Sequence, residues 1–239
     1  MSDVTRFQAL TFDCYGTLID WERGILTALR PMRQRLVDRI DDGQLLVAFG
    51  DAESRIEREH PTLPYTEILR RVHQSLESTF ELPGDAAAAA AFAGSVGDWP
   101  PFPDTVAALR DLQTRFKLVI VSNTDHASFA GTQRSLDIRF DALVLAEDVG
   151  VYKPDHRMFD RALSTLANMG IGRDSVLHVA QSLYHDHVPA KALGLATAWV
   201  DRYRGQSGGA VRPPGIDIRP DYTVGSLREL AVRLGVSTD

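Results

Sequence analysis

Asp13 is the residue of this chain best placed to do chemistry. It directly follows a short apolar segment, residues 7–12, and a Gly16-Thr17 turn comes shortly after it. Such a segment is typical of a buried parallel strand, and open α/β sheets bind their ligands at the carboxyl ends of their strands. A carboxylate there can attack a carbon or phosphorus atom and form a covalent intermediate. The structural alternative is an aspartate that only caps a helix or a turn.

Three other apolar segments also end at polar or charged residues. These are Ser122-Asn123 at the end of residues 117–122, Lys153 after residues 142–145, and Asp186 after residues 175–180. Because the carboxyl ends of parallel strands share one edge of a sheet, we expect these side chains to meet Asp13 in one pocket. The structural alternatives are a helix cap for the Ser-Asn pair, a solvated lysine before a helix, and an exposed turn for the aspartate.

Strand and helix patterns alternate along most of the chain. The expected strands are residues 7–12, 117–122, 142–145, 175–180 and 196–200. The expected helices are residues 105–115, 154–168, 188–193 and 226–234. This alternation predicts an α/β fold, namely a doubly wound parallel sheet with a Rossmann-like core and helices on both faces.

Residues 21–97 carry helical periodicity and almost no strand signal. One amphipathic stripe, with spacings of three and four, runs through Ile25, Leu29, Met32, Leu36 and Ile40. Similar helix signals follow at residues 45–59, 65–80 and 86–93. The sequence therefore predicts an α/β core domain, residues 1–20 and 98–239, with an inserted helical cap domain, residues 21–97.

The four motifs in this order, with helices inserted after the first, resemble the haloacid dehalogenase superfamily, and more narrowly its 2-haloacid dehalogenases of type II. The resemblance covers nearly the whole chain. It implies that Asp13 is the nucleophile and that Thr17 and Ser122 hydrogen-bond its carboxylate or the acid group of the substrate. It also implies that Lys153 supplies a positive charge, which would lower the pKa of Asp13. Asp186 would then orient that lysine or help to activate water.

Tyr15 distinguishes between the reactions of this superfamily. Its phosphate-ester hydrolases resemble one another in an Asp-x-Asp motif, whose second acid protonates the leaving alkoxide. A positioned acid of this kind contributes roughly two to four powers of ten in rate, whereas a halide leaves without a proton. Tyr15 therefore favours a hydrolase that cleaves the carbon–halogen bond of a short 2-haloalkanoic acid through an aspartyl ester, giving a 2-hydroxy acid and halide without a cofactor or metal. The resemblance also implies substrate contacts at Cys14, Tyr15, Asn123 and Ser182.

The predicted cap lacks one pattern of the family, a helix arginine flanked by aromatic and polar residues that clamps the substrate carboxylate. Four arginines of the predicted cap, Arg55, Arg58, Arg70 and Arg71, lie in other surroundings. The residue that holds the substrate is therefore left open. Two other functions remain alternatives: a Mg²⁺-dependent phosphatase acting on a small phosphate ester, and a non-catalytic relic of the superfamily.

Composition restricts the partners and the location. The formal net charge of −6 argues against a nucleic-acid partner, and no apolar run reaches the roughly 20 residues of a membrane helix. The single cysteine, Cys14, excludes an internal disulfide and a multi-cysteine metal site. We expect a small-molecule haloacid as partner and, without a signal-peptide pattern, a cytoplasmic location. A homodimer is expected because two-fold dimers are the commonest assemblies.

Overall fold

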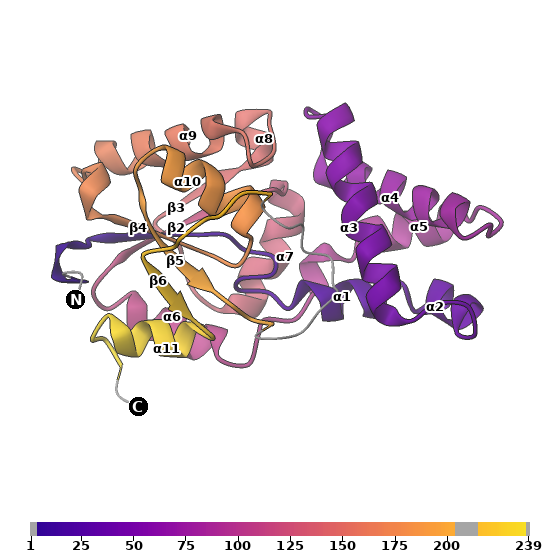
Figure 1. Ribbon diagram of the computed structural model, residues 1–239, viewed down its shortest axis with the longest axis horizontal. Coiled ribbons are helices and arrows are strands. Elements are labelled where there is room, and N and C mark those ends of the chain that lie inside the picture. The colour runs from indigo at the N-terminus through magenta and orange to yellow at the C-terminus, as the bar shows by residue number, and fades with distance from the viewer. Residues whose placement is uncertain (1–3, 204–214, 238–239) are drawn as a thin grey trace.

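The computed structural model describes residues 4–203 and 215–237, and its centre is a six-stranded parallel sheet (Figure 1). The strand order is β3-β2-β1-β4-β5-β6, with β1 at the middle of the sheet. The strands are β1 (Ala9–Phe12), β2 (Lys117–Ser122), β3 (Ala142–Leu145), β4 (Val176–Ala180), β5 (Ala196–Val200) and β6 (Tyr222–Val224). The predicted α/β class with a parallel sheet is confirmed. The sixth strand was not predicted, because three residues with an exposed centre give little apolar signal.

Helices cover both faces of this sheet, which explains why its central strands are apolar throughout. On one side lie α8 (Ala146–Val149), α9 (His156–Asn168) and α10 (Val188–Ala192), and on the other lie α6 (Thr105–Leu112) and α11 (Leu227–Arg233) (Figure 1). Helix α7 (His126–Leu136) follows β2 and was also not predicted. Short single turns complete the described core: η1 (Val4–Arg6), η2 (Val96–Asp98), η3 (Arg173–Ser175) and the π-helical η4 (Leu183–His187).

Five helices are inserted between β1 and β2 and lie to one side of the sheet (Figure 1). They are α1 (Trp21–Ala28), α2 (Arg30–Leu36), α3 (Asp42–Glu59), α4 (Tyr65–Thr79) and α5 (Ala86–Ala93). The apolar stripe from Ile25 to Ile40 packs in or against the core, as predicted. It is shared by two helices, because α1 ends at Ala28 and α2 starts at Arg30. Pro31 occupies the first turn of α2, where its missing N–H is tolerated but would break a continuing helix.

The inserted helices are tied to the core next to the ends of the strands. The backbone N–H of Thr66 in α4 donates to Asp125 Oδ2 over 3.2 Å, and Tyr152 Oη donates to the carbonyl of Leu63 over 2.6 Å. These bonds hold α3 and α4 opposite the carboxyl ends of β1 and β2. Within the described residues, no helix is long and apolar enough to cross a membrane.

Candidate active site

Asp13 directly follows the last residue of β1. Its backbone N–H still donates to the carbonyl of Val179 in β4, so the sheet holds the residue, while its side chain points past the end of the strand. Thr17 Oγ1 donates to Asp13 Oδ2 over 2.6 Å. The chain can turn back to make this bond because Gly16 has a φ of +91°, a conformation that residues with a side chain rarely adopt. The turn thus places a hydroxyl donor on one carboxylate oxygen.

Lys153 holds the other oxygen of Asp13. Its Nζ donates to Asp13 Oδ1 over 2.8 Å, to Asp186 Oδ1 over 2.7 Å and to the carbonyl of Val121 over 2.9 Å. These three bonds use all the protons of an ammonium group, and the lysine side chain is 1% exposed. The two carboxylates raise the pKa of Lys153 against the opposing effect of burial, so the group stays charged. One cation is therefore shared by two buried acids.

A buried histidine contacts the same oxygen of Asp186 that Lys153 holds, and Oδ2 of Asp186 has no hydrogen-bond partner in the described structure. His178 Nε2 lies 3.1 Å from Asp186 Oδ1, and Thr11 Oγ1 lies 2.9 Å from His178 Nδ1. Burial works to raise the pKa of Asp186, but Lys153 and His178 outweigh it and hold that pKa well below its ordinary value. A carboxylate that binds a proton so weakly is a poor base. Of the two predicted roles of Asp186, this geometry favours orienting Lys153 over activating water.

Burial competes with Lys153 for the pKa of Asp13. The cost of burying the carboxylate is the largest influence and raises that pKa above its ordinary value, and Asp186 adds to the rise. Lys153 acts in the expected direction and lowers the pKa, but its effect is smaller than that of desolvation. The pair of acids therefore competes for one positive charge.

Two polar residues at the end of β2 take different places in the pocket. Asn123 Oδ1 accepts the backbone N–H of Lys153 over 2.6 Å, and Asn123 Nδ2 donates to the carbonyl of Lys153 over 3.2 Å. This amide therefore fixes the loop that carries the lysine. Ser122 lines the pocket and is 1% exposed, and its Oγ has no hydrogen-bond partner in the described structure. A buried hydroxyl without a partner is unusual and is satisfied most simply by a bound molecule.

Tyr15 forms a wall of the pocket. Its hydroxyl is 3.0 Å from Thr132 Oγ1, and its ring stacks on Tyr65 and meets Trp99 edge to face. Burial raises its pKa far above the ordinary value, so the phenol stays neutral. The side chain two residues after Asp13 thus contributes an aromatic surface, and its hydroxyl is held by the core.

Of the two remaining predicted substrate contacts, Ser182 lines the pocket and Cys14 does not. Ser182 lines the pocket, and its Oγ accepts the backbone N–H of His185 over 3.1 Å, which caps the π-helical turn that carries Asp186. Cys14 is fully buried and is not among the residues that line the pocket, so its predicted substrate contact is wrong. Successive residues of an extended segment point to opposite sides, which sends Cys14 into the core while Asp13 and Tyr15 reach the pocket.

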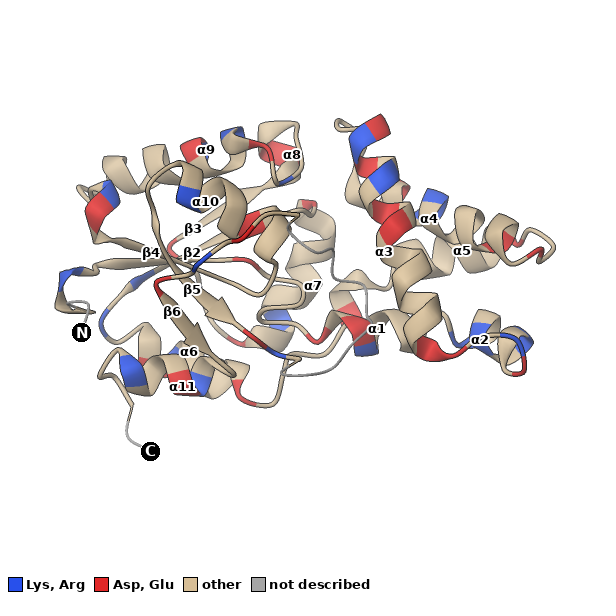
Figure 2. Ribbon diagram, in the orientation of Figure 1, with Lys and Arg blue, Asp and Glu red and all other residues tan. Residues whose placement is uncertain are grey.

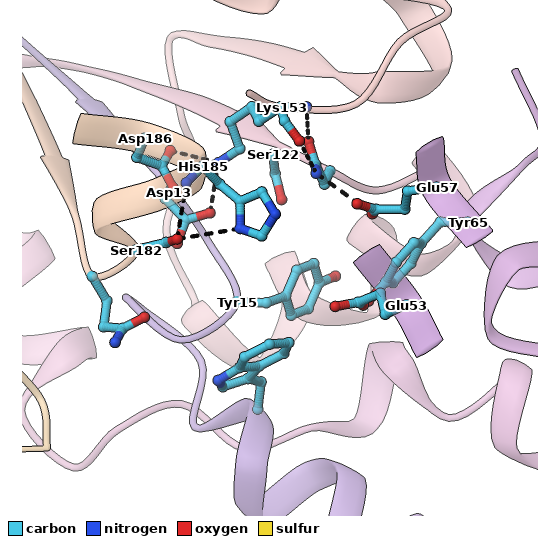
Figure 3. Close-up of a pocket in the computed structure, with 13 residues that line it drawn as sticks. Asp13, Tyr15, Glu53, Glu57, Tyr65, Ser122, Lys153, Ser182, His185 and Asp186 are labelled. Atoms are coloured by element: carbon cyan, nitrogen blue, oxygen red, sulfur yellow. Dashed lines mark hydrogen bonds and ion pairs between the residues drawn. The ribbon is translucent and has the colours of Figure 1, made fainter. Parts of the chain in front are cut away.

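Sequence reasoning missed half of the pocket wall (Figure 3). The missed lining residues are Trp21, Glu53, Glu57, Tyr65, Gln181 and His185. Glu53 and Glu57 lie four residues apart on the buried face of α3, where the apolar pattern leads one to expect hydrophobic side chains. Acidic residues at core positions of an amphipathic helix are the signal in the sequence that indicates this part of the pocket.

The two glutamates enter the pocket from α3, across from Asp13 (Figure 3). Tyr65 Oη donates to Glu53 Oε1 over 2.6 Å, and Asn123 Nδ2 is 3.5 Å from Glu57 Oε1. Burial is the largest influence on both and raises the pKa of Glu53 to about 7 and that of Glu57 well above its ordinary value. The side of the pocket formed by α3 is therefore acidic.

Arg55, Arg58, Arg70 and Arg71 of the inserted helices do not line this pocket. Arg55 pairs with Glu59, while Arg70 and Arg71 both pair with Glu67. Arg58 is exposed and lines a neighbouring hollow with Tyr184. Among the described residues, the pocket around Asp13 has Lys153 as its one lysine or arginine. No arginine clamp faces the candidate nucleophile.

A family model described as a haloacid dehalogenase-like hydrolase matches residues 7–192. The chain is 30% identical over 142 residues to an (S)-2-haloacid dehalogenase of Pseudomonas putida, covering 58% of this chain and 58% of the relative. It is 33% identical over 132 residues to the pyrimidine 5'-nucleotidase YjjG of Escherichia coli (strain K12), covering 54% and 55%. These matches thus span little more than half the length of either relative.

The fold resembles that of an L-2-haloacid dehalogenase from Xanthobacter autotrophicus, solved with chloropropionic acid covalently bound. The TM-score is 0.77, and the match covers 97% of this chain and 100% of that one at 19% identity. At this identity the likeness concerns the fold, and the chemistry must be argued from the side chains.

Proposed function

This chain belongs to the haloacid dehalogenase-like hydrolase family, and we propose that within it the protein hydrolyses the carbon–halogen bond at C2 of a short 2-haloalkanoic acid. The observation that carries the proposal is the environment of Asp13. Its carboxylate is gripped by Lys153 and Thr17 at the edge of a pocket, and the residue two places later is Tyr15, whose phenol stays neutral. The site has a nucleophile and lacks the proton donor that an alkoxide leaving group would need there.

The reaction would take two steps. In the first, an oxygen of Asp13 bonds to C2 of the substrate, and the electron pair of the carbon–halogen bond leaves with the halide. In the second, water attacks Cγ of the aspartyl ester, and the bond between Cγ and the ester oxygen breaks. The 2-hydroxy product departs with that oxygen, Asp13 returns as a carboxylate, and one proton is released to solvent.

The helices α1–α5 supply the other wall of the pocket. We propose that residues 21–97 act as a cap domain on a core of residues 1–20 and 98–239. Trp21, Glu53 and Tyr65 from these helices line the pocket. Water held away from the reacting atoms strengthens the electrostatic influence of Lys153 on Asp13. Asp186 and Asn123 would act as positioning residues, because each holds Lys153 in place.

A labelling experiment tests this chemistry. The protein is incubated in excess over 2-chloropropionate or 2-chloropropionamide in H₂¹⁸O with EDTA present, so that each molecule turns over once. We expect halide release, unlabelled hydroxyl oxygen in the product, and ¹⁸O in the peptide that contains Asp13. Asp13→Asn should lose turnover, whereas Asp51→Asn, an exposed change on α3, should keep it. Label in the product after one turnover would show direct attack by water and refute the proposal.

A Mg²⁺-dependent phosphatase is the second candidate, because relatives include a nucleotidase and a phosphoserine phosphatase. A cation would need Asp13 and Asp186 as ligands. Oδ1 of each accepts from Lys153, whereas Oδ2 of Asp186 is buried without a hydrogen-bond partner in the described structure. Position 15 offers no carboxylate, and the described residues hold no group of three or more His, Cys, Asp or Glu side chains arranged for a metal. The ammonium of Lys153 already lies between the two acids, so this site favours a divalent cation less than one with a second acid at position 15 would. Strong Mg²⁺-dependent turnover of p-nitrophenyl phosphate would reverse this assignment, and a protein without any turnover would be a non-catalytic relic.

A further inference from the structure

The acidic wall formed by Glu53 and Glu57 is unexpected in a site for an anionic substrate. The two residues are 7% and 6% exposed, and they share one face of α3 because they are four residues apart. Figure 3 shows both carboxyl groups on the side of the pocket opposite Asp13. Figure 2 shows acidic residues on several turns of α3. A substrate on Asp13 must therefore present some part of its surface to two carboxyl groups.

No positive charge in the pocket is free to neutralise this wall. Neither glutamate forms an ion pair with a lysine, arginine or histidine in the described structure. Lys153 is the one lysine or arginine that lines the pocket. Its three ammonium protons already go to Asp13, to Asp186 and to a backbone carbonyl. The donors that reach the glutamates are the neutral Tyr65 hydroxyl and the Asn123 amide. When the glutamates are ionised, a free carboxylate entering this space adds a further negative charge without gaining a cation from the pocket lining.

Ser122 indicates, independently of the glutamates, that the pocket lacks a hydrogen-bond acceptor for its hydroxyl. Its hydroxyl is buried at the end of β2, on the strand side of the same pocket, and has no partner among the described residues. A hydroxyl proton there calls for an acceptor on the bound molecule. The two glutamates call for hydrogen-bond donors. One ligand group that satisfies both is a carboxamide, whose carbonyl oxygen accepts while its nitrogen donates two protons.

We infer that the pocket recognises the carboxamide of a 2-halo compound, with its carbonyl oxygen toward Ser122 and its N–H groups toward Glu53 and Glu57. This inference rests on the proposed function and moves its preferred substrate from the short 2-haloalkanoic acid to the neutral amide of that acid. The product is then a 2-hydroxy amide. The glutamates determine specificity by accepting from the amide N–H groups and, once ionised, by repelling the free acid, and the reaction at C2 is unchanged.

The preference depends on pH, since protonated glutamates tolerate an anion. Other groups face them from every neighbouring element: Tyr65 from α4, Arg58 from α3, Asn123 and Lys153 from the core loops, and Tyr152 beside Glu57. Asp13, Asp186 and His185 line the same pocket. Burial raises the pKa of Glu53 to about 7, so the acid wall gains charge as the pH rises through neutrality. The discrimination against the free acid grows in the same range.

Halide release from 2-chloropropionamide and 2-chloropropionate tests the inference. At pH 9 the wild type should favour the amide in kcat/KM by at least about tenfold, the effect of one pKa unit of interaction. At pH 6 the ratio should be smaller. Glu57→Gln and Glu53→Gln should each reduce the ratio at pH 9 by about tenfold, mainly by improving the acid. Asp51→Asn removes a charge from the exposed side of the same helix and should leave the ratio unchanged.

A binding arm separates this inference from the proposed chemistry. Propionamide and propionate, which cannot react, are titrated into wild type and Glu57→Gln and followed by ligand-observed NMR. If neither chloro compound releases halide, but the wild type binds the amide more tightly and Glu57→Gln removes that preference, the recognition stands and the dehalogenation fails. Equal use of acid and amide at pH 9, with no change in either glutamine variant, overturns the recognition and leaves the dehalogenation intact. If a variant does not fold, the wild-type ratio of kcat/KM for amide over acid, measured at pH 9 and pH 6, still tests the inference.

Discussion

Replacing Lys153 by Met removes the one cation shared by Asp13 and Asp186. The Nζ atom lies 2.8 Å and 2.7 Å from the two carboxylates, and the lysine side chain is 1% exposed. Deleting one partner of a buried ion pair leaves an uncompensated charge and costs about 3–5 kcal/mol. The free energy of unfolding should fall by at least this amount, because two acids lose their partner and the carbonyl of Val121 loses a donor.

Lys117 supplies a matched control on the same strand as Val121. Its Nζ lies 2.8 Å from Asp141 Oδ1, much the same distance, but the lysine side chain is 57% exposed. Exposed pairs of this kind contribute about 0.2–1 kcal/mol. Lys117→Met should therefore change the free energy of unfolding by less than about 1 kcal/mol. The comparison sets a buried lysine shared by two acids against an exposed lysine with one acid at a similar distance.

Urea unfolding followed by circular dichroism measures both variants at pH 8 and pH 4. Without Lys153, burial raises the folded-state pKa values of both aspartates above their unfolded values. Such groups contribute stability that is fully present below the unfolded pKa and is lost as the pH rises. The loss in free energy of unfolding caused by Lys153→Met should therefore be smaller at pH 4 than at pH 8. The reasoning is refuted if Lys153→Met loses no more free energy of unfolding at pH 8 than Lys117→Met does. It is also refuted if the loss caused by Lys153→Met is larger at pH 4 than at pH 8.

The other predictions concern a buried glutamate and a close helix contact. Burial raises the pKa of Glu53 from 4.5 to about 7, so its contribution to stability is full below pH 4.5 and is lost as the pH rises through 7. The difference corresponds to about 3 kcal/mol, and Glu53→Gln should remove that slope from unfolding free energies measured between pH 4.5 and 8; an unchanged slope would contradict the assignment. A Cβ on Gly131 would lie 2.5 Å from the Cα of Gly97. Gly131→Ala should therefore lower the free energy of unfolding by about 1–3 kcal/mol, whereas Gly170→Ala meets no atom within 4 Å and tests the cost of its positive φ alone.

The sequence was informative wherever a local pattern is tied to one structure. The strands at residues 117–122, 142–145 and 196–200 were predicted to the residue, because short apolar runs bounded by polar residues are typical of strands in a sheet that is covered on both faces. The meeting of Asp13, Lys153 and Asp186 followed from a rule about strand ends. Helix α7 was missed although Asp125, whose side chain caps it, stood in the sequence.

Other features depend on contacts between segments that are distant in the sequence. The acidic wall exists because α3 packs with Glu53 and Glu57 turned toward the strand ends, and no local pattern states which face of an inserted helix meets a pocket. The raised pKa of Asp13 has the same origin, since desolvation is set by everything that covers the carboxylate. Sequence by itself determined the parallel sheet except for its sixth strand, the order of the motifs and the candidate nucleophile. Tertiary structure alone decided what surrounds that group, because burial and through-space charge are sums over neighbours that the chain brings together only when it folds.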